Sequence, residues 1–244
     1  MSRALTLALA LVALAPAASP AAVQPGAQMF TEGAQCTANF VFTDGGSTYI
    51  GYAAHCAGTG AATDTNGCDA GSLPLGTPVE IDGATRPGTL AYSSWIAMQQ
   101  AGETDSETCE YNDFALVRLD PADAGSVDPS VPGWGGPTGL ASLGGTGSDV
   151  YTYGNSSLRG GVTATSPKQG KVVSRSPEGW STTVYTATPG IPGDSGSGFL
   201  NAQGAAAGTL STVAIAPFAG SNGVGDLPRE LNYMRSRGGP NATL

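Results

Sequence analysis

Three segments of the chain carry side chains that together could perform covalent acyl transfer. His55, the only histidine, is followed by Asp113 at the head of an apolar run, and then by Ser195 within Gly-Asp-Ser-Gly. A serine hydroxyl becomes a good nucleophile only when a base takes its proton, and an imidazole base needs a carboxylate to fix its tautomer. The sequence therefore predicts Ser195 as the nucleophile, His55 as the general base and Asp113 as the orienting carboxylate.

The order of these residues along the chain distinguishes among the unrelated folds that carry such a triad. An α/β-hydrolase needs a histidine after the nucleophile, and none follows Ser195. A subtilisin needs its aspartate well before the histidine, and the only aspartate upstream of His55 is the nearby Asp44. The order His, Asp, Ser matches the chymotrypsin arrangement.

The segments around the three residues carry a clear resemblance. Ala53-Ala54-His55-Cys56, Asn112-Asp113-Phe-Ala-Leu and Gly193-Asp-Ser-Gly resemble the signature segments of chymotrypsin-like serine proteases, in their secreted bacterial form. The resemblance implies an endopeptidase that cleaves protein or peptide substrates through an acyl-enzyme. It also implies an oxyanion hole formed by the backbone N–H groups of Gly193 and Ser195.

The resemblance further places the primary substrate pocket at Pro189, Gly190 and the segment Ser211, Thr212 and Val213. Pro189 stands where trypsin-like relatives carry a carboxylate, so cleavage after Arg or Lys is not expected. Relatives that prefer Glu commonly use a second histidine, which this chain lacks. We therefore expect small or apolar side chains at the cleavage site.

Four cysteines in an exported chain favour two disulfides over a metal site, and the single histidine also argues against zinc. We expect no metal and no cofactor. In the family that the chain resembles, a bridge links the strand before the catalytic histidine to the residue after it. This implies a Cys36–Cys56 bridge and leaves Cys68 and Cys109 as the second pair.

Asp194 raises a separate question, because in zymogen-type relatives this carboxylate pairs with an N-terminal amine released by cleavage. No segment resembling Ile-Val-Gly-Gly precedes Cys36, so we expect activation by export alone. A buried Asp194 still needs a partner. Arg159 is the candidate, and the alternative is that Arg159 is a solvated surface residue.

Composition agrees with an exported protein. Residues 1–22 combine a basic start, an apolar run and small-residue cleavage sites, as in a signal peptide. No later run approaches the roughly 20 apolar residues that a membrane span needs. The net charge of −9 without a basic cluster argues against nucleic-acid binding. We expect a secreted, extracellular monomer that binds neither membranes nor nucleic acid.

The elements that must position the triad are short strands. Runs rich in Val, Thr, Tyr and Phe alternate with turn residues, and a single helix is expected over 226–236, with an Asp cap and a Gly-Gly stop. Together with the resemblance, this predicts an all-β protein of two six-stranded antiparallel β-barrels packed together, with a C-terminal helix. The expected boundaries are signal peptide 1–22, N-terminal segment 23–35, first barrel 36–125, linker 126–147, second barrel 148–225, and helix and tail 226–244.

Two other functions are compatible with these residues. A secreted binding protein could keep the protease fold without turnover, and an esterase could use the same triad, because acyl transfer is common to both reactions. The filled triad favours an enzyme, and the resemblance favours peptides over esters as substrates.

Overall fold

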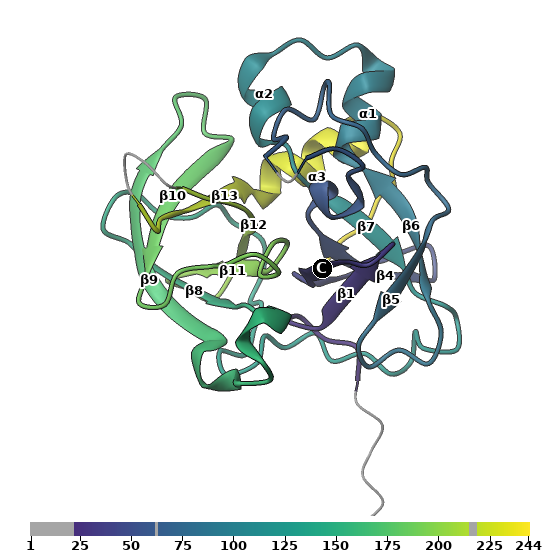
Figure 1. Cartoon of the computed structure of the whole chain (residues 1–244), viewed down its shortest axis with the longest axis horizontal. Helices are drawn as coiled ribbons and strands as arrows, with labels where there is room; N and C mark the ends of the chain where they lie inside the picture. The colour runs from purple at the N-terminus through teal and green to yellow at the C-terminus, as the bar shows by residue number, and fades with distance from the viewer. Residues whose placement is uncertain (1–21, 62, 215–218) are drawn as a thin grey trace, which may run out of the picture.

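The computed structural model describes residues 22–61, 63–214 and 219–244. The predicted signal peptide lies almost wholly outside these residues. Two β-sheet units lie side by side, and the α-helices gather at one end of the molecule (Figure 1). All strand pairs within the two sheets are antiparallel.

The first unit is a seven-stranded sheet in the order β2-β1-β5-β6-β7-β4-β3. Its strands are β1 (Gln28–Thr31), β2 (Ala34–Thr37), β3 (Val41–Asp44), β4 (Ser47–Tyr52), β5 (Pro78–Ile81), β6 (Gly88–Ser93) and β7 (Ala115–Arg118). Only residues 38–40 join its two edge strands, β2 and β3. Because so short a link spans roughly 15 Å at most, the two edges must lie close together and the sheet is strongly curled.

The second unit is a closed barrel in the order β10-β13-β12-β11-β8-β9. Its strands are β8 (Asp149–Tyr153), β9 (Pro167–Arg175), β10 (Ser181–Thr186), β11 (Gly198–Asn201), β12 (Ala206–Val213) and β13 (Asn222–Asp226). Alternate residues point inward and fill the barrel with small and medium apolar side chains, among them Val150, Val172, Val184 and Val224. Closure leaves no unpaired edge strand.

Three α-helices cover one end of the two units: α1 (Ser94–Ala101), α2 (Ser106–Tyr111) and α3 (Leu227–Ser236). The predicted C-terminal helix is α3, and the Asp226 side chain caps it by accepting from the Arg229 N–H. Sequence analysis did not predict α1 and α2. No described helix is long and apolar enough to cross a membrane.

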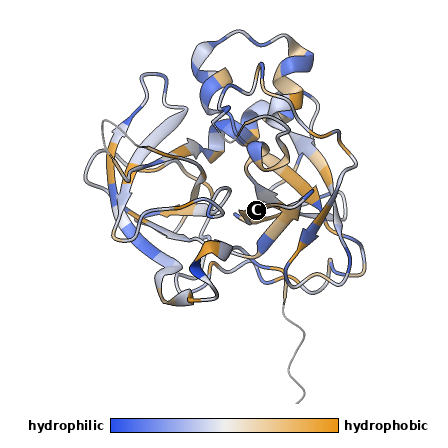
Figure 2. Ribbon diagram, in the orientation of Figure 1, coloured by the Kyte–Doolittle hydropathy of each residue, from blue (hydrophilic) through white to orange (hydrophobic). Residues whose placement is uncertain are grey.

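One of the buried apolar clusters is shared by the two units. Phe114 from the first unit, Leu200 from the second and Leu227 from α3 belong to one buried cluster. Hydrophobic residues are concentrated on the strands, most visibly in the first unit (Figure 2). This shared core fixes the position of the two units relative to each other, and any site between them is rigidly held.

The predicted fold class is confirmed, with a closed six-stranded barrel, a second antiparallel sheet and a C-terminal helix. The first unit differs in detail, because it has seven strands and begins at Gln28 instead of residue 36. The buried side chain of Met29 explains the earlier start, since β1 pairs with β5 through Met29 and Ile81.

Candidate active site

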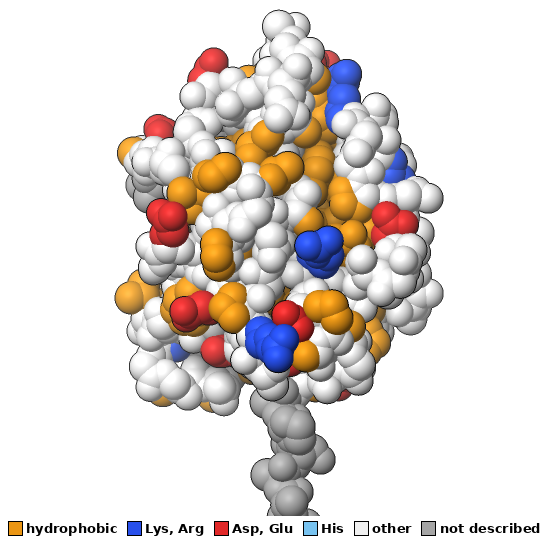
Figure 3. All heavy atoms as spheres, turned by 90° about the vertical axis from the view of Figure 1, so that its right-hand side faces the viewer, with side chains coloured by type: hydrophobic (Ala, Val, Ile, Leu, Met, Phe, Trp, Pro, Cys, Tyr) orange, Lys and Arg blue, Asp and Glu red, His pale blue; other side chains and the backbone are white. Residues whose placement is uncertain are grey.

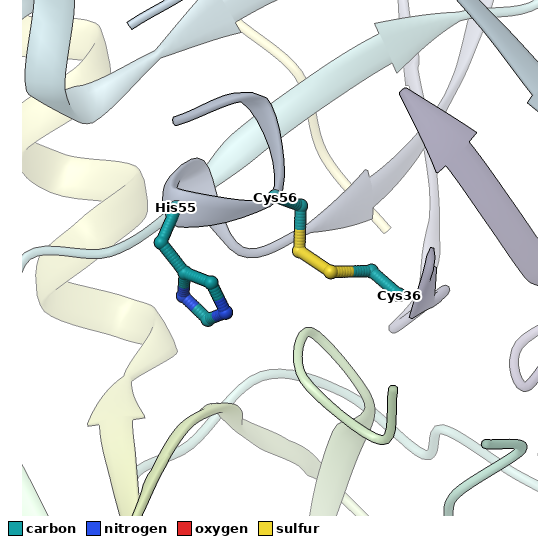
Figure 4. Close-up of side chains that lie close together, drawn as sticks. All are labelled: Cys36, His55 and Cys56. Atoms are coloured by element: carbon teal, nitrogen blue, oxygen red, sulfur yellow. A yellow bond between two sulfur atoms is a disulfide. The ribbon is translucent and has the colours of Figure 1, made fainter. Parts of the chain in front are cut away.

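His55 lies at the junction of β4 and a short 3-10 helix, Ala54–Ala57. Ala54 and Cys56 on either side are buried, whereas the His55 side chain keeps 27% of its surface exposed. A disulfide between Cys36 and Cys56 ties this helix to β2, and the imidazole leaves the helix beside it (Figure 4). The backbone that carries the imidazole is therefore fixed on both sides.

Asp113 is buried just before β7 and contacts His55 twice. Its Oδ2 lies 2.6 Å from Nδ1 of His55, and its Oδ1 accepts a hydrogen bond of 2.8 Å from the His55 backbone N–H. The hydroxyl of Ser211 also donates to Oδ2, at 2.5 Å. A carboxylate acceptor keeps the imidazole proton on Nδ1, so Nε2 is left with the lone pair that a general base needs.

The same contacts set the ionisation of the pair. Burial alone would lower the pKa of His55, but the charge of Asp113 and its hydrogen bond outweigh this effect, and the pKa of His55 is raised above 6.5. Burial would raise the pKa of Asp113, but the His55 charge and the hydrogen bonds from His55 and Ser211 lower it. Asp113 is therefore an anion at neutral pH and stabilises an imidazolium.

Ser195 follows a tight turn in which the Asp194 N–H donates to the Ile191 carbonyl at 2.9 Å. Gly193 has a φ of +94°, and a Cβ built there would lie 2.3 Å from the side-chain oxygen of Gln35. Only glycine meets both conditions. Among the described residues, no acceptor is bonded to the N–H of Gly193 or of Ser195.

Ser195 and His55 border one cavity of about 590 Å³, which Asp113 and Gly193 also line. The predicted triad residues and oxyanion donors thus come from the 3-10 helix after β4, the segment before β7 and the turn before β11, and the fold brings them to a common space.

Solved structures with the same arrangement of elements include three bacterial proteases. Thermobifida fusca Protease A is 22% identical to this chain, with a TM-score of 0.57 over 92% of this chain and 98% of that one. Cellulomonas bogoriensis chymotrypsin is 18% identical, with a TM-score of 0.54 over 91% and 97% of the two chains. A Nocardiopsis protease is 21% identical, with a TM-score of 0.54 over 92% and 99%. The chain has the chymotrypsin-like fold.

No protein-family model matches the sequence, and no curated protein is significantly similar to it. At 18–22% identity, the likeness to the three solved proteases establishes the chymotrypsin-like fold alone.

The sequence predicted five residues of a substrate pocket, and four of them line this cavity. Gly190, Ser211, Thr212 and Val213 line the cavity, but Pro189 is exposed and does not. The side chain of Asn222 from β13 also lines the cavity, beside Gly190. Asn222 was not predicted from the sequence, because a polar residue at the start of a strand carries no signal of a pocket.

Every polar atom of the Asn222 side chain is used. Its Oδ1 accepts from the Gly190 N–H at 2.8 Å, and its Nδ2 lies within donor distance of the carbonyl oxygens of Thr212, at 3.2 Å, and Gly190, at 3.4 Å. A Cβ on Gly190 would lie 2.9 Å from Nδ2. The amide therefore adds a neutral group, held by hydrogen bonds at both polar atoms, to the lining of the cavity.

Asp194 is completely buried under the turn that carries Ser195. Nη2 of Arg159 lies 2.5 Å from its Oδ2, so the candidate partner forms the ion pair. Nζ of Lys168 lies 3.5 Å from the same oxygen, and sequence analysis missed this second cation. Burial lowers the pKa of the Lys168 ammonium, and the Asp194 charge opposes that effect.

The remaining predicted residues are the second cysteine pair. Cys68 and Cys109 are bridged, which ties the loop beside the cavity to α2.

Cys36, Cys56 and His55 lie close enough to hold a metal ion, but both sulfurs belong to a disulfide and cannot ligate as thiolates. On the face shown in Figure 3, Lys and Arg side chains are few and scattered.

Proposed function

We propose that this protein is a secreted serine endopeptidase. The observation that carries the proposal is the pairing of His55 with the buried Asp113 in the cavity that also holds Ser195. A structural role alone gives no reason for a buried carboxylate to bond both the ring and the backbone of a partly exposed histidine. It also gives no reason for that histidine to share a cavity with a serine on a glycine turn.

In this mechanism Ser195 Oγ attacks the scissile carbonyl carbon while Nε2 of His55 takes the hydroxyl proton. The electrons of the carbonyl π bond move to its oxygen, which the N–H groups of Gly193 and Ser195 stabilise. His55 then gives its proton to the leaving amine, which departs and leaves an acyl-enzyme. Water, activated by His55, releases the acid product and restores Ser195.

We further propose that the enzyme cleaves after small or apolar residues. Asn222 contributes no charge to the cavity lining, and its side-chain amide is already held by hydrogen bonds to Gly190 and Thr212. Leu210 also lines the cavity, and its Cδ2 would lie 3.0 Å from a Cβ on Gly190. Gly190, Leu210 and Asn222 carry no charge, so an Arg, Lys or Glu side chain buried against them would meet no opposite charge, at a cost of several kcal/mol.

Export is supported by two observations. The chain carries two disulfides, which persist in oxidising compartments, and Val23, directly after the expected cleavage site, is fully buried in the fold. Cleavage near residue 22 would release a folded unit.

The test is the intact mass of the secreted protein before and after treatment with a peptidyl diphenyl phosphonate. We expect one adduct per chain, lost in Ser195→Ala and kept in Ser197→Ala, a matched change at a neighbouring serine. Profiling with a peptide library and with p-nitrophenyl esters should follow. Absence of an adduct on the folded wild type would favour the binding-protein alternative, and ester hydrolysis without peptide cleavage would favour the esterase.

A further inference from the structure

Ser156 is a buried serine that forms hydrogen bonds to residues 191–195, called the nucleophile turn below because they end at Ser195. It lies in the segment between β8 and the 3-10 helix Ser157–Arg159, and it is 2% exposed. Its hydroxyl donates a hydrogen bond of 2.6 Å to the carbonyl oxygen of Pro192. Its backbone N–H donates to Oδ1 of Asp194 at 3.0 Å. One residue therefore holds the turn at two points, the Pro192 carbonyl and the Asp194 side chain.

The hydrogen bond to Pro192 determines where the N–H of Gly193 points. The carbonyl of Pro192 and the N–H of Gly193 belong to one peptide group, which is trans. In a trans peptide the C=O and N–H bonds point in opposite directions. Because Ser156 holds the carbonyl below the turn, the N–H of Gly193 is directed away from Ser156, and no described residue accepts from it.

We propose that Ser156 is a positioning residue for the oxyanion hole, which acts by preventing rotation of the Pro192–Gly193 peptide. This inference rests on the proposed serine endopeptidase function. Glycine tolerates many backbone conformations, so the peptide next to Gly193 would rotate at little cost without an anchor. Rotation would replace the N–H donor with a carbonyl oxygen, which repels the negative charge that develops in the transition state.

The neighbouring peptide is anchored separately, which isolates the role of Ser156. The carbonyl of Gly193 accepts from Oγ1 of Thr37 at 2.7 Å and from Nε2 of Gln35 at 3.0 Å, both from β2. These bonds hold the Gly193–Asp194 peptide, and Ser156 supplies the side-chain bond to the peptide before it. Loss of the Ser156 hydroxyl should therefore affect the Gly193 N–H while the turn as a whole keeps its place.

The position of Ser156 follows from local structure. Its hydroxyl oxygen accepts from the Leu158 N–H at 3.2 Å and caps the 3-10 helix that carries Arg159. The same helix brings Arg159 to Asp194. The hydroxyl thus uses its lone pair for the helix and its proton for the turn.

The test compares Ser156→Ala with Ser156→Thr, which keeps the hydroxyl, and with Ser157→Ala, a change at the adjacent exposed serine. We expect kcat of Ser156→Ala to fall by at least about tenfold, up to the roughly 10²–10³ that loss of an oxyanion donor costs. KM should stay within about twofold, because substrate binding precedes the developing charge. Inhibition by a peptide aldehyde, whose adduct carries an oxyanion, should weaken by the same factor as kcat/KM. Ser156→Thr and Ser157→Ala should behave like wild type.

If the role of Ser156 is purely structural, Ser156→Ala should have a lower melting temperature or a changed KM, but the kcat and aldehyde affinity of wild type. This result would overturn the inference. Should Ser156→Ala not fold, Ser156→Thr and Ser156→Val, which are nearly equal in volume and differ by the hydroxyl, make the same comparison. Equal kcat in that pair would also overturn it. If the wild-type protein forms no phosphonate adduct, the proposed function fails and the inference fails with it. If the wild-type protein forms the adduct and Ser156→Ala keeps full activity, only the inference fails.

Discussion

Arg159 and Asp194 form a buried ion pair directly beneath the nucleophile turn. Nη2 of Arg159 lies 2.5 Å from Oδ2 of Asp194, and the two side chains are 11% and 0% exposed. The same oxygen accepts from the Ile191 N–H at 3.1 Å. Because Asp194 is bonded to Ser195 in sequence, the pair fixes the backbone on which the nucleophile stands, and it does so with a cation from within the folded chain.

We predict that Arg159→Ala strongly reduces both stability and activity. Removing one partner of a buried pair costs about 3–5 kcal/mol, and the nearby Lys168 should keep the loss toward the lower end of that range. Urea unfolding in a Ser195→Ala background gives the stability, and phosphonate labelling of the single variant gives the reactivity. Arg86→Ala, at an exposed arginine, is the control. Full reactivity of Arg159→Ala would show that the turn does not depend on the pair.

The His55–Asp113 contact predicts the acid limb of the pH profile. A protonated imidazole cannot take the Ser195 proton, and the pKa of His55 is raised above its ordinary 6.5. We expect kcat/KM to fall as the pH drops through a midpoint above 6.5. Steady-state rates across pH measure this, and a midpoint clearly below that value would contradict the structure.

Asp113→Asn should lower kcat by about 10⁴, because an amide cannot hold the proton on Nδ1 of His55 in the productive tautomer. KM should change little. Glu110→Gln, at an exposed acid close in sequence, should keep wild-type rates. A residual kcat above a tenth of wild type in Asp113→Asn would mean that another group orients His55.

Asn222 is expected to restrict the size of the residue accepted at the cleavage site. Asn222→Ala removes the amide that bonds Gly190 and Thr212 and lengthens the pocket. We expect the ratio of kcat/KM for phenylalanyl over alanyl substrates to rise by about tenfold, within the range that differences of a methylene or more produce in apolar pockets. Matched peptide substrates measure it, with Asn241→Ala, at an exposed asparagine, as the control. An unchanged ratio would show that the pocket ends elsewhere.

The parts of the fold and site that the sequence predicted are those encoded locally. His55, Asp113 and Ser195 each lie in a short, informative segment, and α3 carries both its cap, Asp226, and a glycine stop at Gly238 with a φ of +77°. The helix α1 was missed because its N-cap, Ser93, makes no side-chain capping bond and the helix follows a strand directly.

The parts that the sequence did not predict depend on contacts between distant segments. Ser156 reaches Pro192 across a sequence separation of 36 residues, and Asn222 reaches Gly190 across 32. Lys168 is a surface-type residue in the sequence and becomes buried only because β9 passes beside Asp194. Such roles arise from the closed barrel, and residue type at one position does not reveal them.

Glu230 on α3 is a fully buried carboxyl group behind the active site. Its Oε2 accepts from Oγ1 of Thr209 at 2.9 Å, and its Oε1 has no hydrogen-bond partner among the described residues. Burial raises the pKa of Glu230 well above 4.5, despite the Thr209 hydrogen bond, and the negative charges of Asp113 and Asp226 raise it further. The group is therefore protonated in the folded protein over a pH range in which the unfolded chain has lost that proton.

The sign of the pH dependence follows from proton binding. The folded state binds this proton more tightly, so the contribution of Glu230 to stability is fully present below pH 4.5 and is lost as the pH rises toward the folded pKa. Glu230→Gln removes the titrating group. In a Ser195→Ala background, the free energy of unfolding of Glu230→Gln relative to its parent should rise by about 1.4 kcal/mol for each unit of increasing pH across that window. Urea unfolding of both proteins from pH 4 to pH 8 measures the difference in unfolding free energy. A difference that stays constant with pH would show that Glu230 is ionised in the folded protein and that another group compensates its charge.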